Sequence, residues 1–209
     1  MTQSVRKALE YMVDELQYYR KNRIFKAKEI DRIVQKRKEF EEALQTKRSA
    51  EVYLKYIEYE VVLEKIFTKR ASNKKNIREY CTKRIQRLFE QAGGFFPTEH
   101  AFPISHLDYL LYRNDRDGAC KLALNIPKKH PSVPEVWTRC AKALRECGET
   151  EASRSLLERG MRLVEPMKII PEYIKMEEAS PDKNSEQIVA ILNREVAREN
   201  EKAKERVSE

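Results

Sequence analysis

A spacing of about 34 residues runs through the chain and limits the folds open to it. Three leucines stand 34 residues apart, at Leu88, Leu122 and Leu156. Large apolar residues recur at nearly the same interval in the segments paired with them, at Phe102, Trp137 and Ile170. Two helices per period are typical of an α-solenoid, in which a helix pair buries its apolar face only by stacking on its neighbours. The alternative is an irregular helical bundle whose spacing is accidental.

Composition and periodicity both predict an all-α fold. The 209 residues include five Gly and eight Pro, which are few turn residues for a chain of many short strands. We expect Gly93-Gly94 to end one helix and Thr150 to cap another. Apolar residues recur with helical periodicity, which predicts helices over 3–21, 26–46, 50–70, 77–92, from 103, over 118–129, from 134, over 151–164 and 168–179, and from about 186.

Three parts follow from this organisation. We expect an N-terminal helical docking segment over 1–48, a repeat array over 49–200 and a charged tail over 201–209. The tail is highly charged, so we expect it to be disordered.

The net positive charge of the chain comes entirely from its first half. Residues 1–100 hold 23 Lys and Arg against 15 Asp and Glu, which accounts for the whole net charge of +8. A cluster of this kind suits an anionic partner, RNA first; an acidic protein partner or a merely solvated helix face are the alternatives. The candidate contacts lie between 65 and 87 and are Lys65, Lys69, Arg70, Lys74, Lys75, Arg78, Lys83, Arg84 and Arg87.

The sequence offers little for catalysis or metal binding. Its four cysteines form no Cys-x-x-Cys pair, and its three histidines are scattered, so no zinc spacing is present. There is no glycine-rich phosphate loop and no activated-nucleophile motif. We expect no enzyme activity, cofactor, metal or small-molecule ligand, and we expect a soluble intracellular protein with reduced thiols and no membrane segment.

Three tyrosines stand three residues apart in "YLKYIEYE", at 53, 56 and 59, and Glu60 follows them. They could form an aromatic box for a ligand, a platform on which bases stack, or a packing surface. The segments "WTRCAKALRE" and "IPEYIKMEE" repeat the pattern of large residues with a carboxylate after them, which favours packing, with Glu60 tying its helix to a neighbour. The expected packing residues are Tyr53, Tyr56, Tyr59, Glu60, Leu88, Phe89, Trp137, Leu156, Leu157 and Tyr173.

This pattern resembles the half-a-TPR (HAT) repeat, in which two aromatics three residues apart precede a glutamate. The paired helix of that family looks like Ala-Arg-x-x-Phe/Leu-Glu-Arg-Ala, and "EASRSLLERGMRL" and "KRIQRLFEQAGG" are similar to it. The resemblance implies antiparallel helix pairs of HAT/TPR-like repeats stacked into a right-handed α-solenoid, and a place in an RNA-processing complex.

Residues 15–70 are more specific, because they resemble the opening of the U3 small nucleolar RNA-associated protein 6 family. Members of that family usually continue into a long second array of repeats, so this chain resembles a reduced or partial member. The matching positions are Arg20 or Arg23 with Phe25, Glu29-Ile30, Ile33-Val34, Arg37, Phe40-Glu41, Tyr56, Tyr59-Glu60 and Lys69-Arg70.

The family resemblance implies a non-catalytic scaffold of the small-subunit processome, within its UTP-B subcomplex, in the nucleolus. Its implied partners are WD-repeat propeller proteins of UTP-B, the U3 small nucleolar ribonucleoprotein and pre-rRNA, and its implied role is maturation of small-subunit rRNA. The alternatives are a HAT scaffold of splicing or of mRNA 3′-end formation, and a TPR-like co-chaperone that captures acidic peptide tails.

Overall fold

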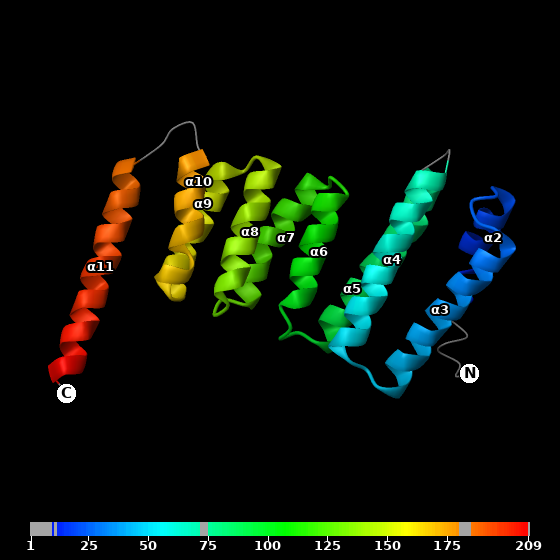
Figure 1. Ribbon diagram of the computed structural model, residues 1–209, viewed down its shortest axis with the longest axis horizontal. Coiled ribbons are helices and arrows are strands. Elements are labelled where there is room, and N and C mark those ends of the chain that lie inside the picture. The colour runs from blue at the N-terminus through cyan, green and yellow to red at the C-terminus, as the bar shows by residue number, and fades with distance from the viewer. Residues whose placement is uncertain (1–9, 11, 72–74, 180–184, 209) are drawn as a thin grey trace. The chain divides into compact units, whose positions relative to one another are not determined.

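The computed structural model describes residues 10, 12–71, 75–179 and 185–208, without the side chains at 75–78, 185, 187, 199–200 and 202–208. Over these residues the chain forms ten α-helices, one short 3-10 helix and no strand (Figure 1). The predicted all-α fold of helix pairs is therefore confirmed. The chain divides into two compact units, Met1–Phe102 and Pro103–Glu209. The functional boundary that we place at residue 48 stays a prediction.

The first unit contains four described helices, joined by short connections. They are α2 (Val13–Lys21), α3 (Ala27–Thr46), α4 (Ala50–Arg70) and α5 (Lys75–Phe95). Helix α4 packs along α5 and also against α3, which packs against α2. The apolar centre of this unit is an aromatic group in which the Tyr19 and Phe67 rings lie 4.5 Å apart and the Phe25 and Phe67 rings 4.8 Å apart.

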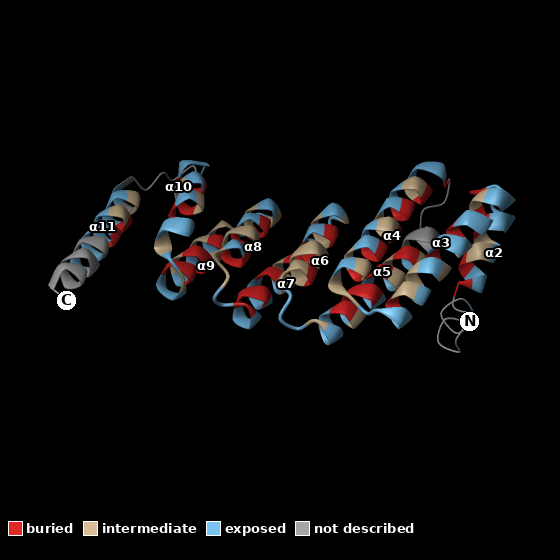
Figure 2. Cartoon of the chain, turned by 60° about the horizontal axis from the view of Figure 1, so that its bottom comes forward, coloured by how far each residue is buried: buried red, intermediate tan, exposed pale blue. Residues whose placement is uncertain are grey.

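The second unit repeats the same construction. Its elements are α6 (Ala101–Tyr112), α7 (Arg116–Lys129), α8 (Pro134–Cys147), α9 (Thr150–Leu163), η1 (Pro166–Lys168), α10 (Ile170–Ala179) and α11 (Ser185–Ser208). Helix α8 packs against both α7 and α9. The core of the second unit contains the buried residues Trp137, Cys140, Leu144, Leu157 and Tyr173. In both units each helix turns a buried side to its neighbours and an exposed side to solvent (Figure 2), as helical periodicity predicts.

Local signals in the sequence account for several helix ends. The Ser49 hydroxyl accepts a hydrogen bond from the Val52 N–H at the start of α4, and the Asp115 carboxylate does the same for Gly118 in α7. Gly148 takes the left-handed conformation, φ +93°, that ends α8. It is a position where glycine costs no steric strain.

Several expectations about helix ends differ from the structure, and the expected helix start at residue 3 lies outside the described residues. Helix α5 runs through Gly93-Gly94 to Phe95, because the rings of Phe95 and Phe96 pack on Tyr53 and hold the last turn in place. Helix α7 begins at Arg116 rather than 118, since Asp115 caps it. Thr150 is the first residue of α9 and not its cap. Residues 201–208, which we expected to be disordered, continue α11 as helix.

Candidate functional site

The three tyrosines of α4 meet the chain's own side chains rather than an open box. Tyr53 and Tyr56 are buried and Tyr59 is half-buried. The Tyr56 ring stacks on Phe40 of α3, with centroids 4.8 Å apart and 9° between the planes. Its hydroxyl donates a hydrogen bond of 3.2 Å to Glu41, and burial raises its pKa well above the usual value. A base or ligand could reach the buried rings of Tyr53 and Tyr56 only by displacing parts of the core.

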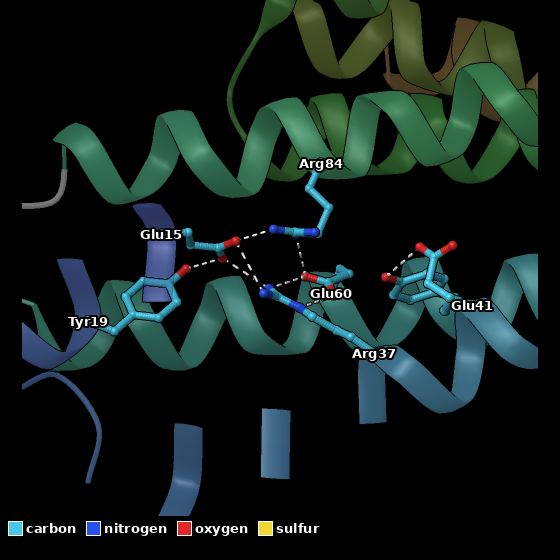
Figure 3. A network of polar contacts seen from close by, with 7 residues as sticks. Glu15, Tyr19, Arg37, Glu41, Glu60 and Arg84 are labelled. Atoms are coloured by element: carbon cyan, nitrogen blue, oxygen red, sulfur yellow. Dashed lines mark hydrogen bonds and ion pairs between the residues drawn. The ribbon is translucent and has the colours of Figure 1, made fainter. Parts of the chain in front are cut away.

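Glu60, directly after the tyrosines, belongs to a buried network of charges (Figure 3). The Arg37 guanidinium, from α3, donates two hydrogen bonds to Glu60, Nε to Oε1 at 2.7 Å and Nη2 to Oε2 at 2.8 Å. It also reaches Glu15 of α2, at 3.0 and 3.2 Å. Arg37 is 0% exposed, and both carboxylates are 1% exposed. One arginine thus joins three helices.

Arg84 of α5 completes the network. Its side chain forms an ion pair with Glu15, and its Nε lies 3.6 Å from Glu60 Oε2. Two arginines and two glutamates, one from each of α2 to α5, therefore balance in charge. This balance lets the charges stay buried, because an unpaired ion in the interior would be costly.

The pKa of Glu15 reports the balance between burial and charge. Burial alone raises it, but the charges of Arg37 and Arg84, with hydrogen bonds from Arg37 and the Tyr19 hydroxyl, outweigh burial and lower it to about 2. Glu41 goes the other way: its burial outweighs the hydrogen bond from Tyr56 and the charges of Arg87 and Arg84, and raises its pKa. Two carboxylates of the first unit, Glu15 and Glu41, therefore have pKa values shifted in opposite directions.

The second unit carries a smaller counterpart. Arg154 of α9 donates hydrogen bonds of 2.6 and 3.2 Å to Glu177 of α10, which is fully buried. Glu177 stands seven residues after Ile170, as Glu60 stands seven after Tyr53. These two pairs show how the glutamate of the repeat motif ties its helix to the preceding one.

Helix α8 departs from this arrangement. Seven residues after Trp137 the chain has Leu144, which is buried. Glu146, which our motif comparison aligned with Glu60, is instead exposed and lies 3.7 Å from Arg139. Cys120, 34 residues before Arg154, lies half-buried against the core. Two residues of the apolar core, Cys120 and Leu144, thus stand where the charge pair stands in the other repeats.

The remaining packing residues all lie within the cores of their units. Trp137 is 1% exposed, and its indole N–H donates to the Pro131 carbonyl at 2.9 Å. The others that are buried are Leu88, Phe89, Leu156, Leu157 and Tyr173.

The basic residues predicted between 65 and 87 do not form one surface of free charges. Arg84 lies inside the network, and Lys83 pairs with Glu79 on its own helix at 2.6 Å. Arg70 is partly exposed and pairs with Glu29 of α3 at 2.9 Å. Lys65, Lys69 and Arg87 are exposed. Lys74 and the side chains of Lys75 and Arg78 lie outside the described residues.

Sequence reasoning missed the role of Arg37, although a signal was present. Arg37 stands between Lys36 and Lys38, so it reads as part of a solvated basic run. Yet it follows Ile33 by four residues, on the stripe that Ile30 begins. A charge on the apolar stripe of a helix needs a buried partner, and the two glutamates supply it.

The described residues contain neither a metal-ligand cluster nor a helix that could span a bilayer. No group of three or more His, Cys, Asp or Glu side chains in the described part of the chain could hold a metal ion. Over the same residues, no helix combines the length and the apolar character that crossing a bilayer requires.

Comparison with known proteins gives two matches. The family model described as U3 small nucleolar RNA-associated protein 6 matches residues 9–91. A curated relative with that same description, from Schizosaccharomyces pombe, is 27% identical over 187 residues. The alignment covers 85% of this chain and 38% of the relative, so the chain spans well under half of the relative's length. The resemblance predicted from residues 15–70 is confirmed.

Proposed function

From the chain's relationship to the U3 small nucleolar RNA-associated protein 6 family, we propose that it acts in ribosome biogenesis with the U3 small nucleolar ribonucleoprotein. Its role there is that of a non-catalytic scaffold in the nucleolus, which supports processing of pre-rRNA and maturation of the small-subunit rRNA. It does so as a subunit of the small-subunit processome, within UTP-B and beside WD-repeat propeller proteins.

One observation carries the proposal. The family match over 9–91 spans all four members of the buried network, Glu15, Arg37, Glu60 and Arg84. The residues that resemble the family therefore include those that lock α2 to α5 together. A segment fixed in this way presents constant helix faces to partners, which is what a scaffold needs.

The basic residues of this segment give the scaffold an affinity for RNA. Lys65, Lys69, Arg70, Lys83 and Arg87 are the members of the set proposed for backbone contacts that the structure shows exposed. Such contacts read charge and not sequence, so they would place the scaffold on a transcript without selecting one. Arg84 is left out of this set because it forms ion pairs with Glu15 and Glu60.

The test is affinity purification of the tagged protein from its own cells, with sequencing of bound RNA and mass spectrometry of bound proteins. We expect U3 small nucleolar RNA, pre-rRNA and WD-repeat proteins. Recovery of spliceosomal or polyadenylation components in their place would overturn the proposal in favour of another HAT scaffold. Recovery of chaperones through acidic tails would favour a TPR-like co-chaperone.

The network provides a matched pair of variants for the same experiment. Arg37→Met should lose the recovered partners, since it disrupts the segment that carries the family match. Lys36→Met removes the same charge from the next position, which is half exposed, and should retain them.

A further inference from the structure

We propose that the turn between α2 and α3, together with the end of α4, is a binding surface for the phosphate backbone of RNA. We call it the turn surface. The inference rests on the proposed function for the identity of the RNA, and apart from Lys69 it names a different part of the first unit from the run that the sequence singled out. The residues of the turn surface are Arg20, Lys21, Arg23, Lys26, Lys28 and Lys69.

The turn is held rigidly in place. The Phe25 ring, within the turn, packs edge-on against Tyr19 of α2 and Phe67 of α4, at 5.8 and 4.8 Å. Arg70 lies over the same Phe25 ring at 4.8 Å and pairs with Glu29 at the start of α3. These contacts bring the end of α4, where Lys69 is exposed, beside a turn more than 40 residues away in sequence.

Arg23 occupies a position that favours glycine. Its φ of +53° is left-handed, and the N–H groups of Arg23 and Ile24 bond back to the carbonyls of Arg20 and Tyr19. The same pattern ends two helices of the second unit, where Asn114 and Gly148 hold the left-handed position. Those residue types tolerate it, whereas arginine is strained there. Strain retained at an exposed position points to a use for its side chain.

The charges of the turn surface form no ion pair among the described residues, although the charge of Lys26 acts on Glu29. All six side chains are exposed, and none is in a salt bridge with another residue that the structure describes. By contrast, Lys36, Lys38 and Lys55 each pair with a glutamate one turn away on the same helix.

Acidic residues do little to offset this charge. Between 20 and 32 there are six basic residues against Glu29 and Asp31. Glu29 accepts hydrogen bonds from the Lys26 backbone N–H and from the Arg70 side chain, and both lower the pKa of that carboxyl. Asp31 is thus the one acidic residue of this stretch that can repel a phosphate.

The surface suits RNA better than a protein. Protein interfaces gather energy in buried aromatic and apolar anchors. The large exposed apolar side chains of the described residues lie elsewhere, the nearest in sequence being Val13 and Val62. A polar surface of arginine and lysine is what backbone phosphates bind.

Direct binding tests the surface. The test variant is Lys21→Gln/Arg23→Gly/Lys26→Gln, and the control is Lys36→Gln/Lys38→Gln/Lys55→Gln, which loses the same charge. Fluorescence anisotropy would follow binding of each full chain to a labelled single-stranded RNA of mixed sequence, from about 50 to about 200 mM salt. Loss of three phosphate contacts should weaken binding at least about ten-fold and lower the salt slope by about two.

Several outcomes decide the proposal. A test variant that binds RNA as tightly as the control would overturn it. So would a test variant that keeps RNA but loses binding to a polyglutamate peptide, since the partner would then be acidic protein. Failure of the proposed function is a separate result, because then the wild-type chain itself would recover no U3 small nucleolar RNA from cells.

The single variant Arg23→Gly separates binding from folding. It relieves the left-handed strain, so the Tm should rise by a few degrees while RNA binding weakens by about five-fold, the effect of one contact. A rise in Tm with unchanged binding would show that Arg23 does not touch the RNA and would overturn its part in the surface.

Discussion

The Nε of Arg37 lies 2.7 Å from Oε1 of Glu60, and the two side chains, 23 residues apart in sequence, are both withdrawn from solvent. Their contact couples α3 to α4, and through Glu15 and Arg84 it extends to α2 and α5. Stability of the first unit should therefore depend on this network far more than on any exposed ion pair.

Arg37→Met should destabilise the first unit by about 3–5 kcal/mol, because it leaves two buried carboxylates with only Arg84 to balance them. Denaturant unfolding followed by circular dichroism measures the loss. Lys36→Met is the control: its pair with Glu39 is half exposed, so the change should stay within about 0.5 kcal/mol. Equal effects of the two variants would contradict the central role of Arg37.

Acid should unfold the first unit in a way that depends on Glu15. Its folded pKa of about 2 lies below the unfolded value of 4.5, so its contribution is complete above pH 4.5 and is lost as pH falls toward 2. The shift corresponds to about 3 kcal/mol. Glu15→Gln should flatten the fall in unfolding free energy over that range. An unchanged slope would mean that Glu15 is not ionised in the network.

Glu41 should show the opposite dependence. Burial raises its folded pKa, so the folded state holds its proton more tightly than the unfolded one, and stability falls as pH rises above 4.5. Glu41→Gln keeps an acceptor for the Tyr56 hydroxyl and removes the charge. It should raise the Tm at pH 7 and leave it nearly unchanged at pH 4. A lower Tm at pH 7 would refute this assignment.

Substitution by alanine should lower stability at Gly160 and raise it at Gly93. A Cβ at Gly160 of α9 would lie 2.8 Å from the Ile169 side chain and 3.0 Å from the Trp137 indole, so Gly160→Ala should cost about 1–3 kcal/mol. A Cβ at Gly93 of α5 meets nothing within 4 Å, and Gly93→Ala should stabilise by about 0.5–1 kcal/mol. Thermal unfolding of both variants checks the two signs.

The charge pair of α9 and α10 should be replaceable as a pair. Arg154→Met alone leaves Glu177 buried without its partner and should cost about 3 kcal/mol. Adding Glu177→Leu should recover most of that loss, because Cys120 and Leu144, at the corresponding positions of the preceding repeat, both pack in the apolar core. A double-mutant cycle measures the coupling, and additive losses would contradict it.

The sequence predicted the helices well where an apolar stripe marks them. The expected ranges 26–46 and 50–70 agree with α3 and α4 within one residue at each end. The end of α5 was missed because the two glycines favour termination locally, whereas the contact of Phe95 with Tyr53 and Arg48 favours one more turn. That contact joins distant residues, which local propensity does not register.

The candidate site was predicted only in part, for a similar reason. The sequence indicated that Glu60 ties its helix to a neighbour, because a glutamate recurs at that place in the repeat motif. It did not identify Arg37 as the partner or separate Arg84 from the exposed charges around it. Sequence patterns do not distinguish one lysine or arginine of a basic run from the next. The packing of α2 to α5 determines that Arg37 and Arg84 are the ones buried in ion pairs.

The order in which the network's members leave the ribosome has a consequence for folding. Glu15, Arg37 and Glu60 are synthesised first and together carry one excess negative charge, which Arg84 cancels. The nascent N-terminal helices therefore cannot settle in their final arrangement until α5 has emerged. Truncations that stop short of residue 84 should be held by chaperones and degraded, whereas those that include α5 should escape.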